Sequence, residues 1–147
     1  MSSRIAGIDY GTKRIGIALA SVEVGIASPH EVYERHDEVQ DASYFTQLVA
    51  TENINKFVVG LPVHLSGEES QQSHAARQFG AWLEEACGVP VEFFDERFTS
   101  SAADDVMATG ELTKKNRKVH RGASDARIML TAYLEAGHGD DNPGGID

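Results

Sequence analysis

The sequence predicts an α/β protein with a mixed five-stranded sheet, in which three antiparallel strands come first, parallel strands follow, and helices cover both faces. Two observations support this fold class. The first quarter of the chain holds three strand-like segments joined by short connections, a pattern typical of an antiparallel meander. The remainder alternates apolar β-branched runs with segments of helical periodicity, which indicates strand–helix units. The length of 147 residues suits one domain with its own core.

The meander strands are expected over residues 4–9, 13–21 and 25–34. "RIAGID" is an apolar run, and "YGT" provides the turn into the second segment, which alternates loosely. Pro29 lies in the third segment and is best accommodated in an edge strand.

Strand–helix units are expected in the rest of the chain. Apolar residues recur at helical spacing in three segments, and a fourth short helix is expected between a Ser/Thr cluster and Gly110. The predicted helices span residues 37–53, 71–87, 100–110 and 124–136, and the predicted strands span residues 56–62 and 90–98. Gly60 and Pro62 are expected to shape the loop beneath the carboxyl edge of the sheet, where ligands collect in such folds.

Charge and composition restrict the function. The net charge of −10 argues against a general polyanion binder, because phosphate contacts need Lys and Arg. Residues 111–121 are an exception, with five Lys or Arg and one Glu. This basic segment is expected to be a loop, either a solvated charge run or a phosphate-binding loop. The tail over residues 137–147 is acidic and rich in Gly, and is expected to be disordered, so the predicted domain is residues 1–136.

Location in the cell is predicted from three further features. The sequence has no apolar run of about 18 residues, which argues against a membrane partner, and its start does not resemble a secretion signal. The single Cys87 cannot form an internal disulfide, which favours the cytoplasm.

Acidic residues end two of the predicted strands and lie on the last helix. Asp9 ends the first strand, Asp95 and Glu96 lie near the end of the last strand, and Asp125 lies on the final helix. Clustered carboxylates are tolerable around a hard divalent cation, so these elements predict a metal site. A structural interpretation of each acid also stays open: Asp9 in a turn, Asp125 at a helix start, and Glu96 paired with Arg97 or a nearby Lys.

Four stretches together resemble the YqgF/RuvX family over about residues 4–136: "GIDYGTKRIGIALAS", "VVGLPVHLSGEES", "FFDERFTSSAA" and "ARIMLTAYLE". The resemblance implies an RNase H-like fold and an endonuclease that hydrolyses phosphodiester bonds with Mg²⁺ or Mn²⁺. It implies 5′-end maturation of the 16S rRNA precursor. The alternative that it implies is resolution of Holliday junctions, which are DNA four-way junctions. Nucleic acid is the implied partner, with ribosomal or transcription machinery as a further one.

By position, Asp9 and Glu96 match the first two acids of the family pattern. The third family acid falls at Gly122, where this chain has none. Asp125 lies three residues later, and positions i and i+3 share a helix face, so Asp125 is the predicted substitute. The predicted catalytic and metal-binding set is therefore Asp9, Glu96 and Asp125.

Substrate contacts are predicted at cations and one hydroxyl near these acids, although Arg97 also suits an ion pair and Thr99 a helix cap. The predicted set is Lys13, Arg14, Arg97, Thr99, Lys114, Lys115, Arg117 and Lys118.

Two other classes of function remain as alternatives. "DYGTKRIG" also resembles the first phosphate loop of the actin, sugar-kinase and chaperone ATPase fold, but those proteins use two such domains and this chain has the length of one. The missing acid at Gly122 is also compatible with a catalytically weakened domain that binds nucleic acid without cutting it. The sequence leaves the choice between monomer and homodimer open.

Overall fold

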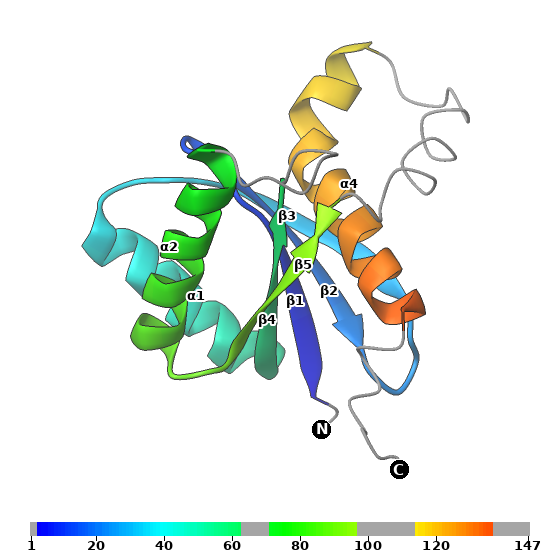
Figure 1. Ribbon diagram of the computed structural model, residues 1–147, viewed down its shortest axis with the longest axis horizontal. Coiled ribbons are helices and arrows are strands. Elements are labelled where there is room, and N and C mark those ends of the chain that lie inside the picture. The colour runs from blue at the N-terminus through cyan, green and yellow to red at the C-terminus, as the bar shows by residue number, and fades with distance from the viewer. Residues whose placement is uncertain (1–2, 63–70, 97–113, 137–147) are drawn as a thin grey trace.

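The computed structural model contains a five-stranded sheet in the order β3-β2-β1-β4-β5 (Figure 1). The structure describes residues 3–62, 71–96 and 114–136, with side chains of the last range described from residue 122 onward. Strands β1, β2 and β3 are antiparallel neighbours, whereas β4 runs parallel to β1 and β5 parallel to β4. The elements are β1 Arg4–Asp9, β2 Arg14–Ser21, β3 Ala27–Glu34, α1 Glu38–Glu52, β4 Ile54–Leu61, α2 Gln71–Cys87, β5 Val91–Asp95 and α4 Lys114–Glu135. The predicted mixed sheet is confirmed.

The prediction of a loop over residues 111–121 is wrong for residues 114–121, which form the first two turns of α4. The helix therefore begins ten residues before the predicted start at residue 124. Lys and Arg are good helix formers, and an apolar stripe is needed only where a helix packs against a core. The first turns of α4, yellow in Figure 1, extend past the edge of the sheet, so they need no such stripe.

Smaller differences concern the last strand. Strand β5 ends at Asp95, so Glu96 lies just beyond it, whereas the predicted strand ran to residue 98. The predicted short helix over residues 100–110, together with Arg97, Thr99 and the tail over residues 137–147, lies outside the described residues.

The sheet separates two apolar cores. Helices α1 and α2 cover one face, where Phe45 and Leu83 pack on Ala6, Ile8 and other strand residues. Helix α4 covers the other face and packs mainly on β2, β3 and β1 (Figure 1). Within the described part of the chain, no helix is long and apolar enough to cross a membrane.

Helix α4 approaches β2 most closely at a pair of glycines. A Cβ atom on Gly16 would overlap the carbonyl group of Gly122 and lie 2.8 Å from its Cα. In the opposite direction there is room, because a Cβ on Gly122 would lie 3.4 Å from the Cα of Gly16 and from Cγ2 of Val32. Gly16 is the partner of Asp9 in the β1–β2 ladder, so the contact sets the height of α4 beside the end of β1.

This asymmetry predicts opposite effects for two alanine substitutions. Gly16→Ala forces α4 away from the sheet and should lower the free energy of unfolding by about 3 kcal/mol or more, the upper part of the range for overpacking. Gly122→Ala should be neutral or stabilise by up to about 1 kcal/mol, since alanine is the better helix former. Urea unfolding of both variants measures the difference, and equal losses in the two would contradict this packing.

Candidate active site

Asp9 is placed on the α4 side of the sheet by strand alternation. Side chains alternate between the two faces of a strand, and in β1 Ile5 belongs to the core beneath α4 while Ile8 belongs to the core beneath α1 and α2. Asp9, four residues after Ile5, therefore shares the face of Ile5. The half-buried Asp9 ends the apolar strand at the carboxyl edge of the sheet.

Glu96 lies over the neighbouring strand because that strand has a glycine there. A Cβ on Gly60 would overlap Oε2 of Glu96 and lie 3.0 Å from its Cγ. Ile8 is the parallel partner of Val59, so Gly60 follows in register beside Asp9. The missing side chain at Gly60 thus leaves the space in which the Glu96 carboxylate lies.

Three carboxylates are electrostatically coupled at this edge. Burial, the charge of Asp125 and then the charge of Asp95 raise the pKa of Glu96 to about 7. Asp125 is half-buried on α4 and is thus the acid that faces Glu96 from the helix. A carboxyl group whose pKa is raised by burial and by neighbouring acids marks a site with an excess of negative charge.

A cavity of about 380 Å³, called here the edge cavity, joins two of the predicted catalytic residues. Asp9 and Glu96 line it, together with Tyr10, Gly11, Thr12, Gly60, Pro62, Gln72 and Ala75. The sequence did not identify Tyr10, Gln72 and Ala75 as part of a site. Tyr10 is contiguous with Asp9 in the sequence, but the two α2 residues come to it only through tertiary packing.

The donor set fits a hard cation. Within the part of the chain that the structure describes, no three His, Cys, Asp or Glu side chains are positioned to hold a metal ion together. Mg²⁺ needs fewer, since it commonly takes one or two carboxylates and completes its shell with water and substrate phosphates. Asp9 and Glu96 supply two carboxylates in one cavity, and a cation there would relieve the repulsion from Asp125.

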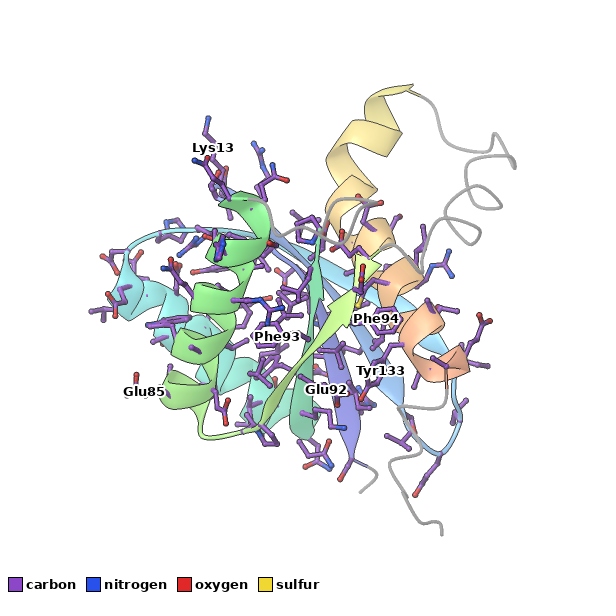
Figure 2. The ribbon with its side chains drawn as sticks, viewed as in Figure 1. Lys13, Glu85, Glu92, Phe93, Phe94 and Tyr133 are labelled. Carbon is purple, nitrogen blue, oxygen red and sulfur yellow. The ribbon has the colours of Figure 1, made fainter. Side chains whose placement is uncertain are left out.

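The predicted substrate residues fall into two groups. Lys13 and Arg14 are exposed where β1 turns into β2, and Arg14 makes a long, exposed ion pair of 3.9 Å with Glu34. Figure 2 shows Lys13 projecting from the edge of the sheet. Lys114, Lys115, Arg117 and Lys118 are on the first turns of α4, and their side chains are outside the described residues, as are Arg97 and Thr99.

A family model described as "RuvX: Holliday junction resolvase" matches residues 3–136. The chain belongs to the RuvX family. A protein from Rhodopirellula baltica named "Putative pre-16S rRNA nuclease" is 43% identical over 135 residues, which are 92% of this chain and 78% of the relative. A protein of the same name from Syntrophomonas wolfei is 35% identical over 134 residues, which are 91% of this chain and 95% of the relative.

Solved structures of other proteins also have a fold similar to that of this chain. RuvC of T. thermophilus in complex with a Holliday junction substrate superposes with a TM-score of 0.56 at 18% identity, covering 92% of the RuvX-family chain and 96% of RuvC. The fowlpox virus Holliday junction resolvase gives a TM-score of 0.51 at 12% identity over 90% of this chain and 99% of the resolvase. At such identities the likeness shows the fold alone. The RNase H-like fold implied by the resemblance is confirmed.

The coupling between α4 and Glu96 can be measured in the metal-free protein. Asp125→Asn removes a charge that raises the pKa of Glu96. That pKa should fall from about 7 but stay above the ordinary value for glutamate, because burial is the larger cause. Carbon-detected NMR titration of the side-chain carboxyl group measures it. Glu135→Gln, at the exposed end of the same helix, is the matched control and should leave it unchanged. An unchanged Glu96 pKa in Asp125→Asn would show that Asp125 does not face the site.

Proposed function

We propose that this chain is a Mg²⁺- or Mn²⁺-dependent endonuclease that processes the 16S rRNA precursor, with Asp9, Glu96 and Asp125 as its catalytic acids. The convergence of Asp9 and Glu96 in the edge cavity, with Asp125 coupled to Glu96 from α4, supports the proposal most strongly. Membership of the RuvX family and the names of the relatives at 43% and 35% identity support the same class of reaction.

Each residue has a role that follows from its position. Asp9 and Glu96 hold the cation, which when bound supplies Lewis-acid activation of water and stabilises charge on the leaving oxygen. In the metal-free state Glu96 keeps a proton on its carboxyl group up to about pH 7, so cation affinity should increase as the pH rises through that value. Lys13 and Arg14, with the cations at the start of α4, bind the phosphates that flank the scissile bond.

Asp125 is proposed to take the role of the acid that the family pattern places at Gly122. Its charge, after burial, contributes to the raised pKa of the Glu96 carboxyl group, which supports this role. Gly122 instead packs against Gly16, where a Cβ would point toward β2 and β3. Gly122, which packs on β2, and Asp125, which supplies the charge, are therefore about one helical turn apart on α4.

Resolution of Holliday junctions is the second candidate, favoured by the description of the family model. A four-way junction has two strands to cut and so needs two sites in a homodimer, whereas a trimming nuclease works as a monomer. We propose the cytoplasm as the place of action, where the single Cys87 stays reduced. Ribosomal or transcription machinery is the further partner that a precursor nuclease would meet.

Cleavage assays with Mn²⁺ on a precursor leader RNA and on a synthetic junction test the proposal. Wild-type protein should cut the RNA, whereas Asp9→Asn and Glu96→Gln should show no measurable cleavage. Asp125→Asn should lose roughly 10- to 100-fold, the range for groups that orient the metal ligands. Glu135→Gln should cut as the wild type does.

Two results would contradict this function. Wild-type protein that cuts neither substrate with Mn²⁺ present would favour a non-cleaving nucleic-acid-binding domain. A protein that cuts only the junction, and is a homodimer by size-exclusion chromatography with light scattering, would establish the second candidate instead.

A further inference from the structure

Two more cavities adjoin the edge cavity. The basic cavity, of about 550 Å³, is lined by Thr12, Lys13, Arg14, Glu34, Arg35 and His36. The aromatic cavity, of about 270 Å³, has Tyr10, Arg35, His36, Phe79 and Trp82 in its wall. Thr12 is shared by the edge and basic cavities, Tyr10 by the edge and aromatic cavities, and Arg35 and His36 by the basic and aromatic cavities. The three cavities are therefore neighbours around residues 10–12 and 35–36.

Three aromatic rings in contact with one another form part of the wall of the aromatic cavity. Tyr10 and Phe79 have ring centroids 4.9 Å apart, and Phe79 and Trp82 have centroids 5.5 Å apart. Trp82 is fixed at its outer end by a hydrogen bond of 3.1 Å that its Nε1 donates to Oε2 of Glu38. Tyr10 and Trp82 are each half-buried, so part of each ring remains available to a ligand.

Arg35 lies at the boundary between rings and cations. Its guanidinium carbon lies 5.4 Å from the centroid of Tyr10 and 5.6 Å from that of Phe79. Its Nη1 donates to the hydroxyl of Tyr10 at 3.0 Å, and its Nε donates to Oδ2 of Asp41 at 3.3 Å.

Asp41 anchors this arrangement although it is almost completely buried, with 1% of its surface exposed. Burial alone would raise its pKa, but hydrogen bonds from the backbone of His36, from Tyr33 and from Arg35 lower it overall. Its hydrogen bond from Tyr33 measures 2.7 Å and that from the His36 backbone 2.9 Å. Asp41 therefore stays ionised and holds Arg35 in place.

The basic and aromatic cavities differ in charge, so they suit different parts of a nucleotide. The basic cavity carries Lys13, Arg14 and Arg35 against one acid, Glu34, which suits phosphates. The aromatic cavity carries the acids Glu38 and Asp41 beside its rings, which disfavours a phosphate but suits a base. Bases stack on aromatic side chains only after leaving their neighbours in the helical stack, so such a cavity selects unpaired nucleotides.

From the nuclease function proposed above, we infer that the substrate is single-stranded RNA at the cleavage point. Its phosphates lie along the basic cavity, and one base next to the scissile phosphate stacks in the aromatic cavity against Tyr10 and Trp82. Tyr10 lines both the edge cavity and the aromatic cavity, so the base would lie in the cavity next to the one that holds Asp9 and Glu96.

Trp82 is the single tryptophan of the chain, which gives a direct test. The full chain is titrated in EDTA, so that nothing is cut, with an unlabelled 12-nucleotide RNA, its DNA equivalent, the RNA duplex and a four-way DNA junction. Single-stranded RNA should change the Trp82 fluorescence saturably, at concentrations where duplex and junction have no effect. An equal response to the DNA strand would show that the ribose is not read, while still supporting the base site.

Variants separate stacking from fold. Trp82→Ala should weaken binding of a labelled RNA, measured by anisotropy, by about 5- to 100-fold, the effect of losing one stacked base. Trp82→Phe should recover most of the lost affinity. His36 is exposed and lines both the basic and the aromatic cavity, so His36→Ala should also weaken binding. Glu135→Gln is the control with the same change of charge, since Glu135 is exposed at the end of α4, on the face of the sheet opposite to Trp82.

The inference fails if the RNA binds without changing Trp82 fluorescence, if Trp82→Ala and His36→Ala both bind as the wild type does, or if duplex or junction binds more tightly. The binding assay contains no metal, so it is independent of cleavage. A protein that binds RNA in this way, but cuts nothing in the Mn²⁺ assay, would refute the nuclease function alone. A protein that cuts RNA with unchanged binding in both variants would refute the base site alone.

Discussion

The close contact between Gly16 and Gly122 is the constraint on which the candidate site depends. It lets the backbone of α4 lie directly on β2, beside the residue that pairs with Asp9. A side chain at position 16 would lift the helix and carry Asp125 away from Glu96. At the far end of the same interface, Lys56, Glu92 and Tyr133 form a hydrogen-bonded trio that ties α4 to β4 and β5, with Glu92 and Tyr133 adjacent in Figure 2. The part of α4 between Gly122 and Tyr133 is thus fixed at both ends.

A second glycine solves a related problem on the neighbouring strand. Gly60 leaves the volume that the Glu96 carboxylate occupies, so two acids share one cavity with a third beside them. Such a cluster lowers the stability of the metal-free protein, because burial and repulsion disfavour the ionised form of Glu96. The raised pKa of Glu96 has the same cause. A cation bound there, as proposed, would relieve this repulsion. In the proposed function, the space at Gly60 lets two acids share one cavity, while Lys13 and Arg14 stay exposed nearby for the phosphates.

Local patterns in the sequence were sufficient for most of the fold. The apolar run of β1, the helical spacing around Phe45 and the β-branched run of β4 each predicted the element that forms, because each buries its own apolar side chains. The start of α4 was missed because its first turns have no core to face. The acids were found as strand ends, but the aromatic cavity was not, since Tyr10, Arg35 and Trp82 meet only through packing between β1, β3 and α2. No spacing rule brings such residues together.

The central claim is that Asp9 and Glu96 bind a divalent cation, with Asp125 beside them on α4. The most direct measurement is a crystal structure of the protein soaked with Mn²⁺, with the ion located by its anomalous scattering. The account predicts a peak in the edge cavity with carboxylate oxygens of Asp9 and Glu96 as ligands and Asp125 bound directly or through water. A well-ordered structure with no peak there, or with Mn²⁺ held elsewhere while the three carboxylates point apart, would contradict it.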